Sequence, residues 1–506
     1  MVPIELLEQA LAQIAALTAE LAAVREAASA ERAELQAQLA AVTAKLDALL
    51  AKKGKKPAPA APPAPPPAAS PEALDGRPRP PAAPDKEEKR RKPRTKKPRP
   101  ELPVVEESVR PEVCAHCGGS RLSNKDTDEV ELVDWVPGYL RRRRVRRTRC
   151  RCADCAKVTS PPIPGACLPK THFTAAFVAW VLYNKFALHL PLERQRRDLA
   201  RMGYPMAHSQ LSDLAGRGLG ELSGIADVLF RQVMAGRTCH SDATGLPVLT
   251  PDKDKTHLGQ MFVFGWGHLA AFRYSPDKTG TSFEQLVADF QGTMVLDASS
   301  THDRALATGR IVWSGCNAHG LRKFRAAKDS EPSLAAEGER WIASWFDQER
   351  LAHEQGLVGP ALLAWRQEHI RPLVTDFRRW LEAVHPTALP KSPLAAATRY
   401  YANHWRALTA FLRDANLPLE NNFAERCLRP QALGRNNWLF AGCHEAGANV
   451  ATAYTLVHTA RLCGVDPLDY LTWALERVAA CRDGGALYAN LTPMAYKEAQ
   501  KLRADG

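Results

Sequence analysis

Two Cys-x-x-Cys pairs place the strongest constraint on how this chain can fold. Cys114 and Cys117 form the first pair, Cys152 and Cys155 form the second, and 34 residues separate them. Tight turns that bring two thiolates together at each pair suit a tetrahedral structural zinc ion, although the common interval is only about 15–20 residues. We therefore predict a zinc-binding module over residues 111–165.

The ligand set of this module stays open at two positions. Cys150 is an alternative to Cys152, and His116 is a less favoured ligand. Four buried cysteines that hold no metal are a further alternative. The chain has 12 cysteines in 506 residues, which indicates a reduced, cytosolic protein rather than a disulfide framework.

Arginine is concentrated between the two cysteine pairs. Eight arginines lie within the eleven residues 141–151. On a strand of a zinc ribbon they would point to both faces, so at least one face must meet solvent or phosphate. Arg141, Arg142, Arg143 and Arg144 are therefore candidate DNA contacts.

Positive charge is unevenly spread along the chain. The first 220 residues carry nearly all of the formal charge of +13. A basic front half ahead of a nearly neutral back half suggests modules that grip DNA, attached to a separate working domain. A solubilising charged tail is the alternative.

No stretch reaches the roughly 18 apolar residues that a membrane span needs. The N-terminus also lacks a basic segment followed by a short apolar core, so it does not read as a signal peptide. We expect no membrane partner and a cytoplasmic, nucleoid-associated location in a bacterium.

The N-terminal segment 1–50 is predicted to be a coiled coil that dimerises the chain. Its heptad positions are Leu7, Ile14, Leu21, Ala28, Leu35, Val42 and Leu49. A lone Ala-rich helix folding back on its own chain is the alternative. Residues 51–110 are rich in Pro, Ala and Lys, which cannot bury a core, so they are predicted to be a disordered basic linker.

Residues 166–232 are predicted to be a helical DNA-binding region. Pro191–Met202 forms a first helix, Gly203 and Pro205 break it, and Ser209 caps a second helix. A helix-turn-helix would place the second helix in the major groove. Simple helix packing is the alternative.

The pattern becomes α/β over residues 233–445, and residues 446–506 are predicted to be helical. The expected order is three strands, a helix, two further strands and a basic helix: Thr238–Leu249, Gln260–Trp266, Leu269–Tyr274, Thr281–Phe290, Thr293–Asp297, Ile311–His319 and Leu321–Arg325. This order matches a ribonuclease H-like domain, and helical patterns at about 330–415 indicate an insertion. The predicted fold class is multidomain α plus α/β.

Three carboxylates are placed to meet in such a domain. Asp242 lies within the first strand, Asp297 ends the fourth, and Glu425 lies on a later helix with Arg429 on the same side. Converging carboxylates can hold two divalent ions about 3.5–4 Å apart, here Mg²⁺ or Mn²⁺. Taken singly, a strand aspartate is a common turn residue, and Glu425 has Arg429 as a possible ion-pair partner.

The chain resembles the large transposase of the insertion sequence 66 family, a D-D-E transposase. The resemblance covers nearly all of the chain and is carried by His240–Thr244, Gly315–Phe324, Glu420–Arg426, Arg429-Pro430, Arg435–Phe440, Thr459–Tyr470 and the Lys185–Leu192 stretch. It implies a catalytic triad of Asp242, Asp297 and Glu425. The family usually has Asp-Gly-Tyr at the second acid, whereas this chain has Asp297-Ala-Ser, so Asp303 remains an alternative. Position 420 is usually Asp and is Glu here.

The resemblance also implies the substrate and the partners. Terminal inverted repeats and target DNA would be the substrates, and two small proteins of the same element are expected accessory partners. The residues expected to contact phosphate or order the site are His319, Arg322, Lys323, Arg426, Arg429 and Arg435. The rival hypotheses are a catalytically decayed DNA-binding regulator of transposition and a zinc-stabilised scaffold.

Overall fold

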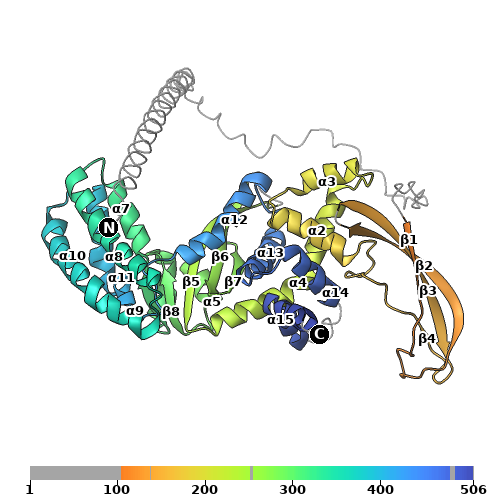
Figure 1. Ribbon diagram of the computed structural model, residues 1–506. Coiled ribbons are helices and arrows are strands. Elements are labelled where there is room, and N and C mark those ends of the chain that lie inside the picture. The colour runs from red at the N-terminus through yellow and green to blue at the C-terminus, as the bar shows by residue number, and fades with distance from the viewer. Residues whose placement is uncertain (1–103, 137, 251–254, 479–484, 505–506) are drawn as a thin grey trace, which may run out of the picture. The chain divides into compact units, whose positions relative to one another are not determined.

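The computed structural model describes residues 104–136, 138–250, 255–478 and 485–504 (Figure 1). The chain divides into two compact units, Met1–Thr95 and Lys96–Gly506, and every described residue belongs to the second. The predicted coiled coil and almost all of the predicted linker lie outside the described residues. Both therefore stay predictions.

The first sheet is built on a long β-hairpin. Its strands are β1 (Val104–Val109), β2 (Leu122–Val136), β3 (Tyr139–Cys152) and β4 (Val158–Thr159). The antiparallel strands β2 and β3 turn at Gly138, whose φ of +99° favours glycine, and β1 pairs parallel with β3. Because β1 lies inside the range predicted as disordered linker, that prediction is wrong for Val104–Val109.

The second sheet is mixed, with strand order β7-β6-β5-β8-β9. Its strands are β5 (Thr238–Val248), β6 (His257–Trp266), β7 (Leu269–Ser275), β8 (Gly292–Leu296) and β9 (Ile311–Gly315). The first three are antiparallel, and β8 and β9 continue parallel to β5, which is consistent with a ribonuclease H-like domain. The strand predicted to reach His319 ends at Gly315, because helix α7 (Asn317–Ala326) begins two residues later.

Alternate residues of β6 face two separate apolar cores. Met261 and Val263 join a core built with α2 (Ala175–Phe186), α4 (His208–Met234) and other helices. Phe262 and Phe264 join a second core beneath the opposite face of the sheet. This period of two is the reason a nearly continuous apolar run forms a strand that is buried on both faces.

The edge of the sheet is covered by helix α13 (His444–Leu462). Thr459 Oγ1 accepts a hydrogen bond from the backbone N–H of Ala270 at 3.3 Å, and Thr455 Oγ1 accepts one from Phe272 at 2.8 Å. These hydroxyls satisfy backbone groups on the edge strand β7 that would otherwise be free to pair with another chain. The remaining helices around this sheet are α5 (Gly280–Leu286), α6 (Asp303–Ala307), α12 (Asn422–Trp438), α14 (Pro467–Val478) and α15 (Pro493–Ala504).

The predicted pair of helices before the sheet is present, with a different second N-terminus. Helix α3 spans Leu192–Arg201, and α4 begins at His208 with Ala207, not Ser209, as its N-cap. Gln210 Oε1 accepts a hydrogen bond from the Ala207 N–H at 3.0 Å and so replaces the predicted serine cap. Much of α4 is buried in the first core, and none of the described helices is long and apolar enough to cross a membrane.

A helical insertion follows α7 and has a core of its own. Its helices are α8 (Pro332–Glu354), α9 (Gly359–Trp365), α10 (Arg371–Val384) and α11 (Pro393–Leu408), drawn in green to blue in Figure 1. Trp345, Phe377 and Tyr401 are fully buried there and pack edge to face with ring centroids 5.0–6.1 Å apart.

A buried ion pair joins two helical segments of this insertion. Arg366 is 1% exposed; its Nε donates to Glu349 Oε2 at 2.9 Å and its Nη1 donates to the Phe411 carbonyl at 2.9 Å. Arg366→Ala should lower the free energy of unfolding by about 3–5 kcal/mol, because the buried Glu349 carboxylate would keep, among the described residues, only the exposed His353, 3.3 Å away, as an ion-pair partner. Urea titration monitored by tryptophan fluorescence measures this change.

The matched control for that substitution is an exposed arginine of the same insertion. Arg350 pairs with Glu354 at 2.8 Å, and its side chain is 58% exposed. Arg350→Ala should change the free energy of unfolding by less than about 1 kcal/mol, because exposed ion pairs contribute little. Equal losses in the two variants would show that the Arg366–Glu349 pair has no special structural role.

Candidate active site and metal centres

Two of the predicted carboxylates lie on neighbouring strands. Asp242 lies in β5, the central strand, and pairs with Val263 of β6. His240 of β5 lies opposite Val295 of β8 in parallel register. Two residues further along both strands, Asp242 therefore lies beside Asp297, on the same side of the sheet.

The electrostatic environment of Asp242 is unusual for an aspartate. Burial raises its pKa to about 6, and the carboxylates of Asp297 and Glu425 add to the increase. The backbone N–H of Ala243 donates to Asp242 Oδ1 at 2.7 Å and partly opposes this shift. A cation among these carboxylates would relieve their repulsion, which is the expected property of a metal site.

Asn421 fixes the start of α12 against the sheet. Its Nδ2 donates to the Ser241 carbonyl at 2.7 Å, and its Oδ1 lies 2.8 Å from His240 Nδ1. The amide oxygen is therefore the acceptor from His240, whose pKa is lowered to about 4 by burial. The Asn421 N–H also donates to Cys316 Sγ at 3.2 Å, so one residue joins α12 to both β5 and the end of β9.

Glu425 lies one turn after Asn421 and has two basic neighbours from α7. Arg322 Nη2 forms an ion pair with Glu425 Oε1, and His319 Nδ1 lies 3.8 Å from the same oxygen. The carboxylate side chain is 30% exposed. Glu425 thus lies on helix α12, and its ion-pair partner is Arg322 rather than Arg429.

The three predicted carboxylates are not all within single-ion distance of one another. Within the described ranges, the groups whose potential ligand atoms lie within 4.8 Å are Cys114–Cys117–Cys152–Cys155 and Cys316–His319–Glu425. Sequence reasoning missed Cys316 as a neighbour of Glu425. Its Cys-x-x-His spacing to His319, inside a stretch already singled out, was an available signal.

The two candidates for the second acid differ in their surroundings. Asp297 lies at the end of β8, where His302 Nδ1 is 3.3 Å from its carbonyl oxygen and 3.5 Å from its Oδ1. Asp303 is exposed in the first turn of α6. Asp297, unlike Asp303, is among the groups that raise the pKa of Asp242. This difference favours Asp297.

The basic residues predicted around the site differ in whether other protein groups already hold them. Arg322 pairs with Glu425, and Arg435 Nη1 donates to the Gly245 carbonyl of β5, so both are held by the protein. Arg426 and Arg429 are exposed and form no ion pair among the described residues. Lys323 Nζ lies 5.4 Å from the centroid of the Tyr400 ring.

The arginines predicted to contact DNA in the zinc module are paired with carboxylates. Each of the four has an acidic partner in the first sheet: Arg141 with Asp134, Arg142 with Glu131, Arg143 with Glu107, and Arg144 with Glu106 and Glu129. The acidic run 126–134 was the available signal, and β2 sets it against β3. Because these arginines already have carboxylate partners, their charge does not by itself indicate DNA binding. A DNA contact by these arginines stays a prediction.

The four cysteines of the two pairs converge. Cys114 Sγ lies 3.4 Å from Cys155 Sγ, and Cys117 Sγ lies 3.5 Å from Cys152 Sγ. Four sulfurs at about 2.3 Å from a common zinc ion would be roughly 3.8 Å apart, close to these separations. A hydrogen bond from the His116 backbone is the main cause that lowers the pKa of Cys114 to about 6.

Neither alternative ligand belongs to this cluster. Cys150 is buried and its Sγ lies 3.6 Å from Asn124 Oδ1. Among the described residues, neither His116 nor Cys150 belongs to the group of potential ligands that lie within 4.8 Å of one another. The geometry therefore favours Cys152 over Cys150.

Comparison with known proteins finds a matching family model and several relatives. A model of the family described as "Transposase IS66 family" matches residues 170–449, more than half of the chain and a range that contains all three carboxylates. Three relatives from Sinorhizobium fredii carry the names uncharacterized protein y4hP, y4qI and y4jD. The first is 30% identical over 73% of this chain and 71% of its own length, the second 30% over 75% and 73%, and the third 28% over 75% and 77%.

Proposed function

This chain belongs to the IS66 family of transposases, and we propose that it catalyses metal-dependent DNA cleavage and strand transfer at the ends of an insertion sequence. Asp242, Asp297 and Glu425 are the proposed catalytic residues. The observation that carries the proposal is the register of β5 and β8, which brings Asp242 beside Asp297, with Glu425 of α12 near enough to add to the raised pKa of Asp242. Three acids from two strands and a helix thus influence one another within the matched range.

The donor set fits Mg²⁺ or Mn²⁺, since carboxylate oxygens are the ligands that these hard cations prefer. Asp242, Asp297 and Glu425 would hold the ions. When bound, the ions would polarise the scissile phosphodiester and favour attack by water or by a 3′-hydroxyl. The nucleophiles are water and DNA, so no covalent protein–DNA intermediate is required.

The protein's own residues would bind and position the DNA. Arg426 and Arg429 are exposed beside Glu425 without carboxylate partners among the described residues, so they are free to contact phosphates. For Glu425 to become a metal ligand, its ion pair with Arg322 has to open. Arg322 would then be released toward the phosphate, which couples metal loading to DNA binding.

Metal affinity at this site should fall as the pH drops below about 6. Asp242 has a raised pKa, so it is protonated in the metal-free protein below that pH, and the ion must displace the proton. The affinity is expected to fall about tenfold per pH unit between pH 6 and pH 5, as for one displaced proton. Mn²⁺ titration followed by electron paramagnetic resonance measures this, and Asp242→Asn should flatten the dependence. A wild-type affinity unchanged from pH 7 to pH 5 would contradict the assignment.

The remaining modules support the same reaction. We propose a structural zinc ion at Cys114, Cys117, Cys152 and Cys155, in a module that contributes to terminal-repeat binding. A coiled coil over residues 1–50 would pair two subunits so that both ends of the element react together. Two small proteins of the same element are the proposed accessory partners.

An end-cleavage assay tests the proposed function. Full-length protein, with accessory proteins supplied, is incubated with DNA that carries the repeats flanking its own gene. Mg²⁺ should yield strands that end in a 3′-hydroxyl at the repeat boundary and, with target DNA present, joined products. Absence of both products despite specific end binding would contradict the proposal.

A non-catalytic regulator is the second candidate function. It is favoured by one observation: Ala298 and Ser299 follow Asp297, where the family usually has Gly-Tyr. Such a protein would bind the ends and block transposition without cleaving them. Retained binding without cleavage in the assay above would support this candidate instead.

A further inference from the structure

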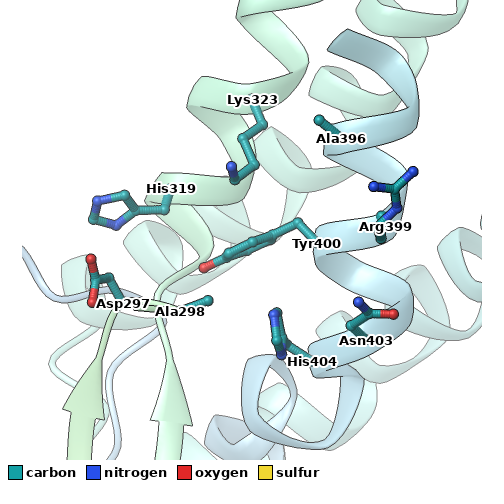
Figure 2. Close-up of a pocket in the computed structure, with 9 residues that line it drawn as sticks. All are labelled: Asp297, Ala298, His319, Lys323, Ala396, Arg399, Tyr400, Asn403 and His404. Carbon is teal, nitrogen blue, oxygen red and sulfur yellow. The ribbon is translucent and has the colours of Figure 1, made fainter. Parts of the chain in front are cut away.

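A cavity of about 320 Å³ opens beside Asp297, between the ribonuclease H-like sheet and the helical insertion (Figure 2). Asp297, Ala298 and His319 line one end of it, and Lys323, Tyr400 and His404 line its middle. Three further lining residues lie on α11: Ala396, Arg399 and Asn403. The cavity therefore begins at a proposed catalytic carboxylate and extends into the insertion.

The charge of the cavity favours an anionic ligand. Lys323 and Arg399 form no ion pair with a carboxylate among the residues that the structure describes, and Arg399 is exposed. Asp297 is the one carboxylate in the lining. Two cations that lack carboxylate partners, in a cavity that starts at the proposed scissile site, suit a phosphate adjoining the one being cleaved.

The middle of the cavity has the surface that a nucleobase needs. The Tyr400 hydroxyl donates to the Cys316 carbonyl at 2.9 Å, which fixes the ring under Lys323. His404 interrupts the helical geometry of α11, with φ −119° and ψ 21°, and its ring lies 5.6 Å from that of Tyr400. The Tyr400 ring is buried and supports its neighbours, whereas His404 is half-buried and Asn403 is exposed, so the imidazole can stack a base and the amide can offer it hydrogen bonds.

The volume limits the part of the ligand that enters the cavity to about one nucleotide. Small-ligand pockets begin at about 300 Å³, and a duplex cannot enter a space of that size. A base that enters must leave its stack, as in enzymes that extrude a nucleotide into a pocket. We propose that this cavity binds a single unstacked nucleotide of the element's end, next to the scissile phosphate, through His404, Asn403 and the cations Lys323 and Arg399. This inference rests on the proposed transposase function and assigns a substrate-binding role to the helical insertion.

Fluorescence of 2-aminopurine tests this proposal because the base brightens when it leaves a stack. The probe is placed in turn at each position within a few nucleotides of the cleavage site. Full-length protein is added with Ca²⁺ in place of Mg²⁺, so that the DNA stays intact. The wild type should raise the fluorescence severalfold at one position.

Two substitutions alter the lining of the cavity and leave the proposed catalytic carboxylates unchanged. Arg399→Ala removes a cation, and Ala396→Trp fills the space from an exposed position on α11. Each should abolish the fluorescence increase and slow Mg²⁺-dependent cleavage about tenfold, the order of magnitude expected when one phosphate or base contact is lost. Both positions are exposed, so the melting temperature should stay unchanged.

The matched controls lie on the same helix. Arg406→Ala and Ala402→Trp make the same changes at exposed positions that do not line the cavity, and both should behave as wild type. Equal losses in all four variants, or in none, would overturn the proposal. Wild-type cleavage without any unstacked position would overturn it while leaving the transposase function intact. Failure of the wild type both to bind and to cleave the ends would overturn the two together.

Discussion

Replacing Asp242 by Asn is expected to reduce end cleavage by at least about 10³-fold, because a lost metal ligand removes several kcal/mol of transition-state stabilisation. The two side chains have nearly the same shape, so the β5 register and its pairing with β6 should persist. Binding of the element's ends should stay within about threefold, since phosphate contacts come from basic residues elsewhere. Gel-shift and cleavage assays on the same DNA separate these two effects.

The same substitution, Asp242→Asn, is expected to stabilise the folded protein although it reduces cleavage. Burial and two neighbouring carboxylates raise the pKa of Asp242 from 3.8 to about 6, so the folded state binds a proton more tightly than the unfolded state does. Above pH 6, the ionised side chain therefore destabilises the folded protein, and this cost disappears as the pH falls toward 4. Asp242→Asn should raise the melting temperature at pH 7. Retained cleavage or a lower melting temperature would each argue against a strained catalytic carboxylate.

Loss of one cluster thiol is expected to remove stoichiometric zinc and loosen the end of the β2–β3 hairpin. Zinc bound by four thiolates contributes on the order of 10–16 kcal/mol in small zinc modules, far more than the two-residue strand β4 can supply. Cys117 is exposed, so Cys117→Ser removes a ligand without opening a cavity in a core. Elemental analysis and limited proteolysis measure the two consequences.

Cys150 provides the control for the zinc prediction. Cys150→Ala changes a buried thiol of the same hairpin that contacts Asn124 and lies outside the cluster. It should keep one zinc per chain and lose only stability, by about 1–2 kcal/mol for a small buried group. Full zinc occupancy in Cys117→Ser, or its loss in Cys150→Ala, would contradict the four-cysteine assignment.

Patterns local in the sequence predicted much of the fold. The apolar runs of β6 and β8 indicated strands that are buried on both faces. The strand assignments placed Asp242 within one strand and Asp297 at the end of another. The Cys-x-x-Cys spacing likewise identified the four thiols that meet.

Contacts between distant segments were not predictable in this way. The carboxylate partners of Arg141–Arg144 depend on the pairing of β3 with β1 and β2, which a one-residue shift would change. Asn421 and His240 lie 181 residues apart in the chain, and no periodicity relates them. The cavity beside Asp297 depends on how α11 packs against β9 and α7, and nothing in residues 393–408 alone indicates that packing.

The helical insertion gives the domain a property that the three acids alone do not provide. It has its own aromatic core and the buried Arg366–Glu349 pair, so it can form a rigid structural element beside the site. Helices α7 and α11 then present Lys323 and Arg399 toward the cavity that begins at Asp297 (Figure 2). Catalysis and DNA positioning would thus be divided between the sheet and the insertion.

The most direct test of the central claim compares wild type, Asp297→Ala and Asp303→Ala in Mg²⁺-dependent cleavage of the element's own ends. We expect wild type and Asp303→Ala to cleave at rates within about threefold of each other, since Asp303 is exposed and is not among the groups that shift the pKa of Asp242. Asp297→Ala should bind the ends and leave them uncut. Cleavage by Asp297→Ala, or a wild type that binds without cutting, would contradict the assignment of Asp242, Asp297 and Glu425 as the catalytic centre.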